Sequence, residues 1–247
     1  MNVAAIIQAR NGSTRLPNKT FLKLSGRSLL YHVVNRLKPS VEIDKIIIAT
    51  TKNNNDKSIE KWCIENNIEV YRGDENNVLK RYYKASIKHN VDIIVRVTAD
   101  DPFKDFNLID TAIRILKKNE LDFVCNNFPV SFPEGLDVEV FSFKTLEISY
   151  KNAESDFEKE HVTQYVHKNK EKFKIFNILN ERDLSYHRWT IDTIYDYRFA
   201  QMIYNKLFSE NKIFQQDEIY KLLTNNPEIF KINSSVKKSN LYIKKLN

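Results

Sequence analysis

The chain opens with the stretch VAAIIQARNGSTRLPNK, residues 3–19, in which five apolar residues are followed by a polar loop. The apolar run is typical of a buried strand, and similar runs recur at residues 45–50, 68–71 and 92–97. Segments with helical spacing of apolar residues separate these runs, at residues 28–38, 56–67 and 77–90. Strands that alternate with helices predict right-handed crossovers and a mostly parallel central sheet with helices on both faces.

The second half of the chain continues this pattern less regularly. Helices are predicted over residues 108–118, 155–169 and 195–208. Strands are predicted over residues 122–126, 137–143, 173–178 and 186–192. Because no repeat or Pro/Gly/Ser-rich linker divides the chain, we expect one α/β domain.

Composition limits the classes of function without choosing one. The 247 residues carry 39 Lys+Arg and 32 Asp+Glu, and this net charge of +7 suits an anionic partner. Part of the excess lies in the C-terminal tail, for which we expect a solvated, loosely packed state. Cys63 and Cys125 fit no zinc-ligand spacing, and no segment resembles a signal peptide or a membrane span. We expect a cytoplasmic protein that binds neither membrane nor nucleic acid.

The loop after the first strand places three cations around a single glycine. Residues 8–19 are expected at the carboxyl edge of the sheet, where ligands bind in doubly wound folds. There Arg10, Arg15 and Lys19 offer positive charge to a polyphosphate, and backbone N–H groups near Gly12 add donors. The alternative is a solvated basic surface. The absence of GxGxxG and GxxxxGK[ST] argues against a dinucleotide dehydrogenase and a P-loop ATPase.

Carboxylates follow two of the predicted strands. Asp100 and Asp101 follow the apolar strand within RVTADDP (96–102), and Asp192 is the last residue of WTID (189–192). Such positions suit Mg²⁺, which takes oxygen ligands and bridges carboxylates to phosphates, although Asp-Asp-Pro is also common in turns and helix caps. On residues 134–141, Asp137 and Glu139 share a strand face, where they either bind substrate hydroxyls or form the polar face of an edge strand.

Six segments together resemble one enzyme family, the cytidylyltransferases that activate acidic sugars. They are QARNGSTRLPNK (8–19), YRGDENNVLKRYYKA (71–85), RVTADDP (96–102), PEGLDVEVF (133–141), EKEHVT (158–163) and HRWTID (187–192). Their order and spacing are similar to those of the spore coat polysaccharide biosynthesis protein F family. This family is in turn similar to the acylneuraminate and 3-deoxy-manno-octulosonate cytidylyltransferases.

The resemblance implies a fold, a reaction and a division of the chain. The implied fold is a single Rossmann-like domain of the nucleotide-diphospho-sugar transferase type, which is GT-A-like. The implied reaction transfers CMP from CTP to an acidic sugar, with Mg²⁺ as cofactor and pyrophosphate as product. Residues 1–126 would then form the nucleotide-binding half, residues 127–233 the acceptor-binding and metal-completing half, and residues 234–247 a basic tail.

The resemblance also implies roles for individual residues. Arg10, Lys19 and Asp100 would be catalytic, and Asp100 and Asp192 would hold Mg²⁺. The nucleotide would be bound by Gln8, Ala9, Arg10, Gly12, Ser13, Thr14, Arg15, Lys19, Gly73, Arg81 and Asp100. The acceptor would be bound by Asp137, Glu139, His161 and Arg188.

The chain departs from the usual family pattern at two positions, and two further questions stay open. Asn18 stands where glycine is usual, and Asp101 stands where many members have a small or apolar residue. Asp101 either joins the metal ligands or caps the following helix, and we expect the cap. The rival enzyme is a GT-A-type glycosyltransferase with a nucleotide-sugar donor, although RVTADDP lacks the DxD motif of that class. A homodimer is an expectation from the relatives only.

Overall fold

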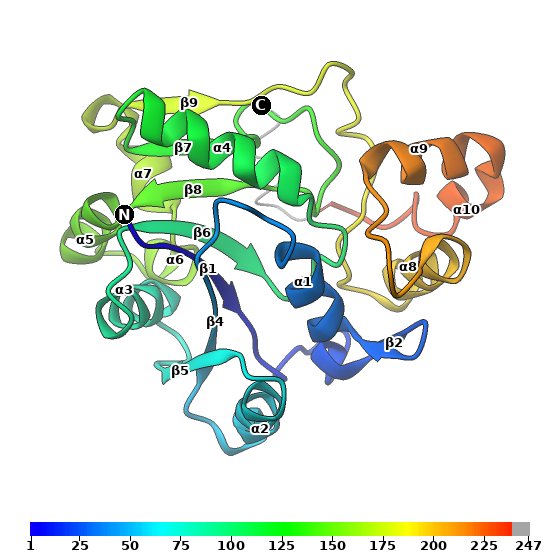
Figure 1. Cartoon of the computed structure of the whole chain (residues 1–247), viewed down its shortest axis with the longest axis horizontal. Coiled ribbons are helices and arrows are strands. Elements are labelled where there is room, and N and C mark those ends of the chain that lie inside the picture. Colours follow the sequence, from blue (N-terminus) through cyan, green and yellow to red (C-terminus); the bar gives the residue numbers. More distant parts are fainter. Residues whose placement is uncertain (239–247) are drawn as a thin grey trace.

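A seven-stranded sheet forms the centre of the computed structural model, which describes residues 1–238 (Figure 1). Its order is β5-β4-β1-β6-β8-β7-β9, and β8 alone runs antiparallel to its neighbours. The strands are β1 (Val3–Gln8), β4 (Lys45–Thr51), β5 (Glu69–Gly73), β6 (Ile93–Thr98), β7 (Phe123–Cys125), β8 (Glu139–Ser142) and β9 (Ile175–Asn177). The mostly parallel sheet predicted from the sequence is confirmed.

Helices cover both faces of this sheet, as expected. One face packs against α1 (Leu29–Leu37), α2 (Lys57–Glu65) and α4 (Phe106–Lys118). The other packs against α3 (Val78–Lys88), α5 (Phe143–Asn152) and α7 (Gln164–Lys168), with α6 (Asp156–Glu160) beside α3. Within β1, Val3, Ala5 and Ile7 enter the first cluster, and Ala4 and Ile6 enter the second. Alternate residues of β1 thus face opposite sides of the sheet. Because helices bury both sides, the central strands are apolar on both.

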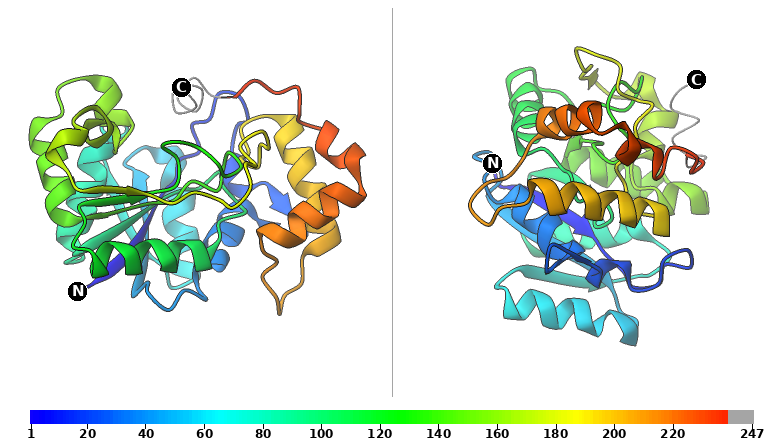
Figure 2. Two further views of the ribbon diagram at one scale, coloured as in Figure 1. Left: turned by 90° about the horizontal axis from the view of Figure 1, so that it is seen from above. Right: turned by 90° about the vertical axis from the view of Figure 1, so that its right-hand side faces the viewer.

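A third apolar cluster lies beyond the carboxyl ends of the parallel strands. It contains Leu24 of the strand β2 (Lys23–Leu24), which pairs with β3 (Arg27–Ser28), and residues of the helices α8 (Ile194–Leu207), α9 (Gln216–Asn225) and α10 (Pro227–Lys231). These helices stand beside the sheet rather than on one of its faces (Figures 1 and 2). Trp189 and Phe103 are buried at the centre of this group, which we call the C-terminal lobe.

Side-chain caps fix where several helices begin. The hydroxyls of Ser28 and Ser142 accept from the third residue of α1 and α5 respectively, and Asp105 caps α4. Thr193 and Asp196 form a capping box at the start of α8. Each cap satisfies backbone N–H groups that have no partner within the helix. Short 3₁₀ turns complete the chain, at η1 (Lys19–Phe21), η2 (Asn54–Asp56) and η3 (Lys170–Lys172).

Two predicted elements are wrong. Residues 186–192 form no strand: only Arg188 makes a bridge, to Glu134, and the apolar side chains of Trp189 and Ile191 pack in the C-terminal lobe. The helix expected over residues 155–169 is two helices, because the backbone turns at His161 between α6 and α7. The sequence analysis also missed α5, α9, α10 and the β2–β3 hairpin.

Two further expectations concern the ends and the surroundings of the chain. No helix within residues 1–238 is both long and apolar enough to cross a membrane. Of the predicted basic tail, residues 239–247 lie outside the described residues, so the expectation of a solvated tail is not tested there. Both cysteines are buried as free thiols.

Candidate functional site

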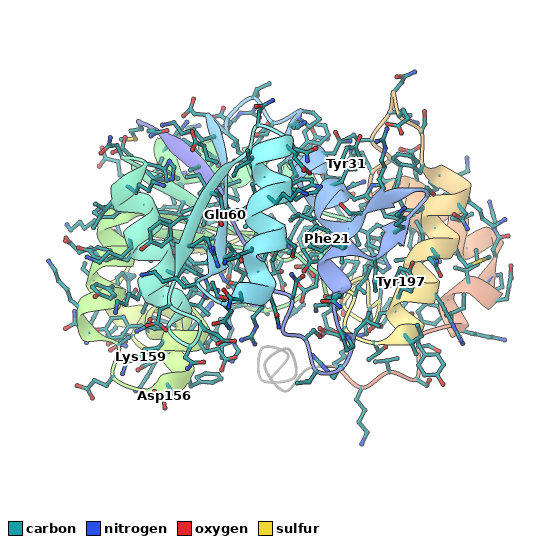
Figure 3. All side chains as sticks on the ribbon, turned by 90° about the horizontal axis from the view of Figure 1, so that it is seen from below. Phe21, Tyr31, Glu60, Asp156, Lys159 and Tyr197 are labelled. Carbon is teal, nitrogen blue, oxygen red and sulfur yellow. The ribbon has the colours of Figure 1, made fainter. Side chains whose placement is uncertain are left out.

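A cleft of about 450 Å³ lies where the carboxyl ends of β1 and β6 meet the C-terminal lobe. Figure 3 shows α6, marked by Asp156 and Lys159, on the opposite side of the molecule from α8, marked by Tyr197. The cleft is lined by Gln8, Ala9, Arg10, Gly12, Ser13, Thr14, Arg15, Lys19, Thr20, Val78, Arg81, Arg96, Thr98, Ala99, Asp100, Asp101, Lys104, Glu134, Gly135, Asp137, Glu139, Glu160, His161, Thr190 and Asp192. Of the site residues predicted from the sequence, only Gly73 and Arg188 are absent from this lining.

The loop of residues 8–19 is anchored at both ends by hydrogen bonds. The side chain of Asn11 donates to the Asn55 carbonyl oxygen at 2.8 Å and to Ser58 Oγ at 2.9 Å, and its backbone N–H donates to Asp56 Oδ1 at 2.8 Å. At the other end, Thr20 Oγ1 donates to the Arg10 carbonyl oxygen at 3.1 Å. The cations of this loop are therefore carried on a fixed backbone.

Asn18 explains one departure from the family pattern. Its backbone is left-handed, with φ of 54° and ψ of 25°, immediately before the 3₁₀ turn that carries Lys19. Glycine adopts this conformation without strain, and asparagine is among the few other residues that do so readily. The substitution therefore keeps the turn that directs Lys19 into the cleft.

Three polar groups on this side of the cleft have no partner among residues 1–238. The exposed guanidinium of Arg10 forms no ion pair within residues 1–238. Gln8 Oε1 and Arg81 Nε are buried and accept or donate no hydrogen bond in the same part of the chain. Burial, together with the charge of Arg10, lowers the pKa of Arg81. Buried polar atoms without a partner, such as Gln8 Oε1 and Arg81 Nε, are expected where a ligand supplies the missing partner.

Two glycines predicted in the nucleotide site differ in what surrounds them. A Cβ on Gly12 would meet nothing within 4 Å, so the backbone there faces open cleft. A Cβ on Gly73 would lie 2.8 Å from Tyr71 Cε1 and 3.1 Å from Arg81 Cγ. Gly73 therefore acts behind the cleft wall, by letting the Arg81 side chain pack closely.

Lys19 joins the two carboxylates that the sequence suggested as metal ligands. Its Nζ lies 2.7 Å from Asp100 Oδ2 and 2.9 Å from Asp192 Oδ1, and it also donates to the Ile191 carbonyl oxygen at 3.0 Å. Burial lowers the pKa of Lys19, but the two carboxylates outweigh it and the net shift is upward. Burial alone would raise the pKa of Asp100, and the Lys19 charge reverses this to a net decrease.

Asp192 is held by two arginines as well as by Lys19. Its Oδ2 lies 3.1 Å from Arg15 and 3.3 Å from Arg188. Arg188 is itself buried, and it pairs with Glu134 at 2.7 Å and with Asp196 at 2.9 Å. Burial would lower the pKa of Arg188, but the Asp196 hydrogen bond and the surrounding carboxylates raise it. In this structure Arg188 therefore orients Asp192 rather than reaching the cleft.

Gly135 brings the Asp192 segment close to the sheet, and sequence reasoning missed it. Its φ is +105°, and a Cβ there would lie 2.7 Å from the Thr190 nitrogen and 2.9 Å from the Trp189 carbonyl carbon. Only glycine fits this backbone conformation and this close approach. The glycine within EGLD was the available signal, because a glycine inside an extended segment often marks close backbone contact.

The expectation that Asp101 caps the next helix is wrong. The cap of α4 is Asp105, which accepts from the backbone N–H groups of Asn107 and Leu108. Asp101 is buried, accepts from Thr98 Oγ1 at 2.5 Å and pairs with Lys104 at 3.0 Å. Burial and the neighbouring Asp100 raise the pKa of Asp101, although Lys104 opposes the shift.

The predicted acceptor residues also differ from one another. Glu139 is buried and pairs with Arg96 at 2.6 Å, opposite it in the β6–β8 register, and it accepts from Thr163 and Asn127. Asp137 is half-buried in the cleft wall, and its carbonyl oxygen accepts from Lys104 Nζ at 2.6 Å. His161 lines the cleft and packs edge-on against Phe157. Arg96, Thr98 and Lys104 belong to the site and were not singled out from the sequence.

Comparison with known proteins gives consistent matches. A family model described as cytidylyltransferase matches residues 4–242. The spore coat polysaccharide biosynthesis protein SpsF of Bacillus subtilis is 33% identical over 234 residues, which cover 92% of this chain and 96% of that protein. The 3-deoxy-manno-octulosonate cytidylyltransferase of Geobacter sulfurreducens is 28% identical over 119 residues, 48% of this chain and 47% of that protein.

A solved structure agrees over the whole fold. The cytidylyltransferase from Leptospira borgpetersenii serovar Hardjo-bovis superposes with a TM-score of 0.90 at 35% identity, covering 97% of this chain and 100% of that one. The similarity includes both the sheet and the C-terminal lobe, because nearly all of this chain is aligned.

Proposed function

The chain belongs to the cytidylyltransferase family, and from that membership we propose that it transfers CMP from CTP to an acidic sugar, releasing pyrophosphate, with Mg²⁺ as cofactor. The observation that carries this proposal is the presence in one cleft of Arg10, which forms no ion pair within residues 1–238, on an anchored loop, together with a Lys19–Asp100–Asp192 cluster. A triphosphate needs cations along its length, and a metal that bridges its oxygens needs carboxylates.

The residues of the cleft suit Mg²⁺. Asp100 and Asp192 offer only oxygen, and both approach the same cation, Lys19. Within residues 1–238 no group of three or more His, Cys, Asp or Glu side chains is arranged to hold a metal ion. A pair of carboxylates matches Mg²⁺, which takes one or two of them and completes its shell with phosphates and water. When bound, Mg²⁺ would neutralise charge that develops on the phosphates during transfer.

The protein's own groups act by positioning and by charge. The acceptor oxygen forms a bond to the α-phosphorus of CTP while the bond from that phosphorus to the bridging oxygen breaks, and the electron pair leaves with pyrophosphate. The acceptor's hydroxyl proton passes to solvent through the open cleft. Arg10 and Arg15 would hold the β- and γ-phosphates, and Lys19 would stabilise charge on the reacting phosphate. Gln8 Oε1 and Arg81 Nε, which have no hydrogen-bond partner in the described part of the chain, would bind the nucleoside.

The acceptor is assigned by likeness and by one feature of the cleft wall. The relatives SpsF and 3-deoxy-manno-octulosonate cytidylyltransferase, by their names, act in polysaccharide biosynthesis and on an acidic sugar. Asp137, half-buried in the cleft lining, would accept hydrogen bonds from sugar hydroxyls. These points support a sugar acceptor, and the likeness to the relatives supports an acidic one.

A pyrophosphate-release assay tests the proposal. The full chain with Mg²⁺ is crossed with CTP, UTP, ATP and GTP and with a panel of acidic sugars, including 3-deoxy-manno-octulosonate and N-acetylneuraminate. We expect pyrophosphate only with CTP and an acidic sugar, and none from Asp100→Asn. Release of a nucleoside phosphate from nucleotide-sugars, without pyrophosphate from any pair, would instead identify a glycosyltransferase.

A further inference from the structure

The ammonium group of Lys19 has used all its hydrogen-bond donors. An ammonium carries three N–H groups, and here they meet Asp100 Oδ2, Asp192 Oδ1 and the Ile191 carbonyl oxygen at 2.7, 2.9 and 3.0 Å. The side chain is only 14% exposed. No N–H remains for a phosphate, although Lys19 is the lysine of the cationic loop that would bind one. Lys19 must therefore release at least one partner when a triphosphate arrives.

The oxygens that Lys19 occupies are those that the proposed metal needs. One oxygen of each carboxylate is bound to Lys19, and the second oxygen of Asp192 is shared by Arg15 and Arg188. A divalent ion placed between the carboxylates would meet the ammonium at close range, where like charges repel. Occupation of this position by Lys19 and by a metal ion is therefore mutually exclusive.

We infer that Lys19 is the resident cation of the Asp100–Asp192 pair, and that a divalent metal ion replaces it only when a triphosphate gives Lys19 new partners. This inference rests on the proposed function, since it assumes a triphosphate in the cleft. The exchange leaves no buried charge without a partner, because Lys19 moves onto phosphate oxygens as the carboxylates receive the metal. Arg10, which forms no ion pair within residues 1–238, provides a first phosphate contact before the exchange.

The consequence is a coupling between two binding events. Without nucleotide, the carboxylates are already satisfied and bind a metal weakly. With nucleotide, the same carboxylates are released and bind it more tightly. Because coupling free energies are reciprocal, the metal must raise nucleotide affinity by the same factor.

Titration of Mn²⁺, followed by the electron paramagnetic resonance signal of the free ion, tests this without any turnover. The full chain is titrated alone and with α,β-methylene CTP, which cannot lose pyrophosphate. We expect wild-type affinity for Mn²⁺ to rise at least tenfold with the analogue. We expect Lys19→Met to bind Mn²⁺ at least tenfold more tightly than wild type in the absence of nucleotide.

Two further variants fix where the effect occurs. Lys23→Met removes an exposed lysine of the neighbouring hairpin and should leave Mn²⁺ affinity unchanged. Adding Asp100→Asn to Lys19→Met should abolish the gained affinity, and a gain that survives would overturn the inference. Equal Mn²⁺ affinity of wild type and Lys19→Met without nucleotide would also overturn it.

The design separates this inference from the proposed function. If wild type binds no α,β-methylene CTP, the proposed function fails, whatever Lys19→Met does with Mn²⁺. If the analogue binds but leaves Mn²⁺ affinity unchanged, only the resident-cation role of Lys19 fails. This second comparison uses wild type alone, so an unchanged Mn²⁺ affinity overturns the inference even if Lys19→Met does not fold, while a rise is assigned to Lys19 by the Lys19→Met result because the phosphates of the analogue also bind Mn²⁺.

Discussion

The two walls of the cleft carry similar charged residues but use them differently. On the wall of the N-terminal loop, Arg10 forms no ion pair within residues 1–238, and Arg81 Nε has no hydrogen-bond partner there. On the other wall, Glu139 binds Arg96, and Arg188, which lies behind the cleft lining, binds Glu134, Asp192 and Asp196 together. Arginine serves both walls, yet only Arg10 keeps its charge without an ion pair within residues 1–238, because Arg15 and Lys19 of the same loop are already paired with carboxylates.

The difference separates ligand-binding charge from structural charge. A buried polar group left without a partner lowers the stability of the folded chain, so it is retained where a ligand completes it, whereas the exposed Arg10 stays hydrated at no such cost. A buried ion pair contributes little net stability, but removing one partner is strongly destabilising because the other charge stays buried. Substitutions on the first wall should therefore affect ligand binding, and substitutions on the second should affect folding.

The largest effect is expected for Arg188→Met. Methionine fills similar space but leaves Glu134 and Asp196 without their cation, and both are buried. We expect the free energy of unfolding to fall by about 3–5 kcal/mol, measured by urea denaturation at pH 7. Arg198→Met, which removes an exposed arginine on α8, is the matched control and should change stability by less than about 0.5 kcal/mol. A stable Arg188→Met variant would mean that this network is not what holds Asp192.

A smaller effect, on activity rather than on stability, is expected for Arg10→Met. Because Arg10 pairs with no carboxylate within residues 1–238, its loss should leave the urea midpoint unchanged. Under the proposed function, kcat/KM for CTP should fall on the order of a hundredfold, or about 2.7 kcal/mol of transition-state stabilisation. Arg182→Met, in an exposed loop away from the cleft lining, should retain full activity. Loss of stability without loss of activity in Arg10→Met would reverse the contrast between the walls.

Local patterns predicted most of the fold but not its connections. The apolar runs of β1, β4 and β6 are visible in the sequence because these strands are buried on both sides, whereas the edge strand β5 is only partly buried. The antiparallel insertion of β8 between β6 and β7 depends on pairing between distant segments, which no local pattern encodes. Residues 186–192 misled for the same reason, because burial in the C-terminal lobe produces the same alternation as burial in a sheet.

The candidate site, too, was only partly predictable from local sequence. The loop of residues 8–19 could be found because its cations and glycine are adjacent in sequence. The sequence could not show that Arg188 is paired and Arg10 is not. Arg188 forms ion pairs with Glu134 and Asp196, and only folding brings these carboxylates close to it. Asp101 and Asp105 both precede α4, and the choice of cap depends on where that helix starts. The helix starts two residues before the predicted position, which makes Asp105 the cap.

The smallest effect concerns the pH dependence of the C-terminal lobe. His187 is buried among Tyr186, Trp189 and Phe230, and burial, with a contribution from Lys238, lowers its pKa to about 4. Because this value lies below the ordinary 6.5, folding favours the neutral ring. Its contribution to stability is therefore present above pH 6.5 and is lost as the pH falls toward 4.

His187→Phe keeps the aromatic packing and removes the titration, so it should flatten this pH dependence. Between pH 7 and pH 5, wild type should lose roughly 2 kcal/mol more unfolding free energy than the variant, measured by urea denaturation at both values. Among residues 1–238 no buried histidine lines the cleft, so affinity for α,β-methylene CTP at pH 7 should be the same in both proteins. Equal losses on acidification would show that His187 is not the group that titrates, and a changed nucleotide affinity would show that the lobe and the cationic wall are coupled.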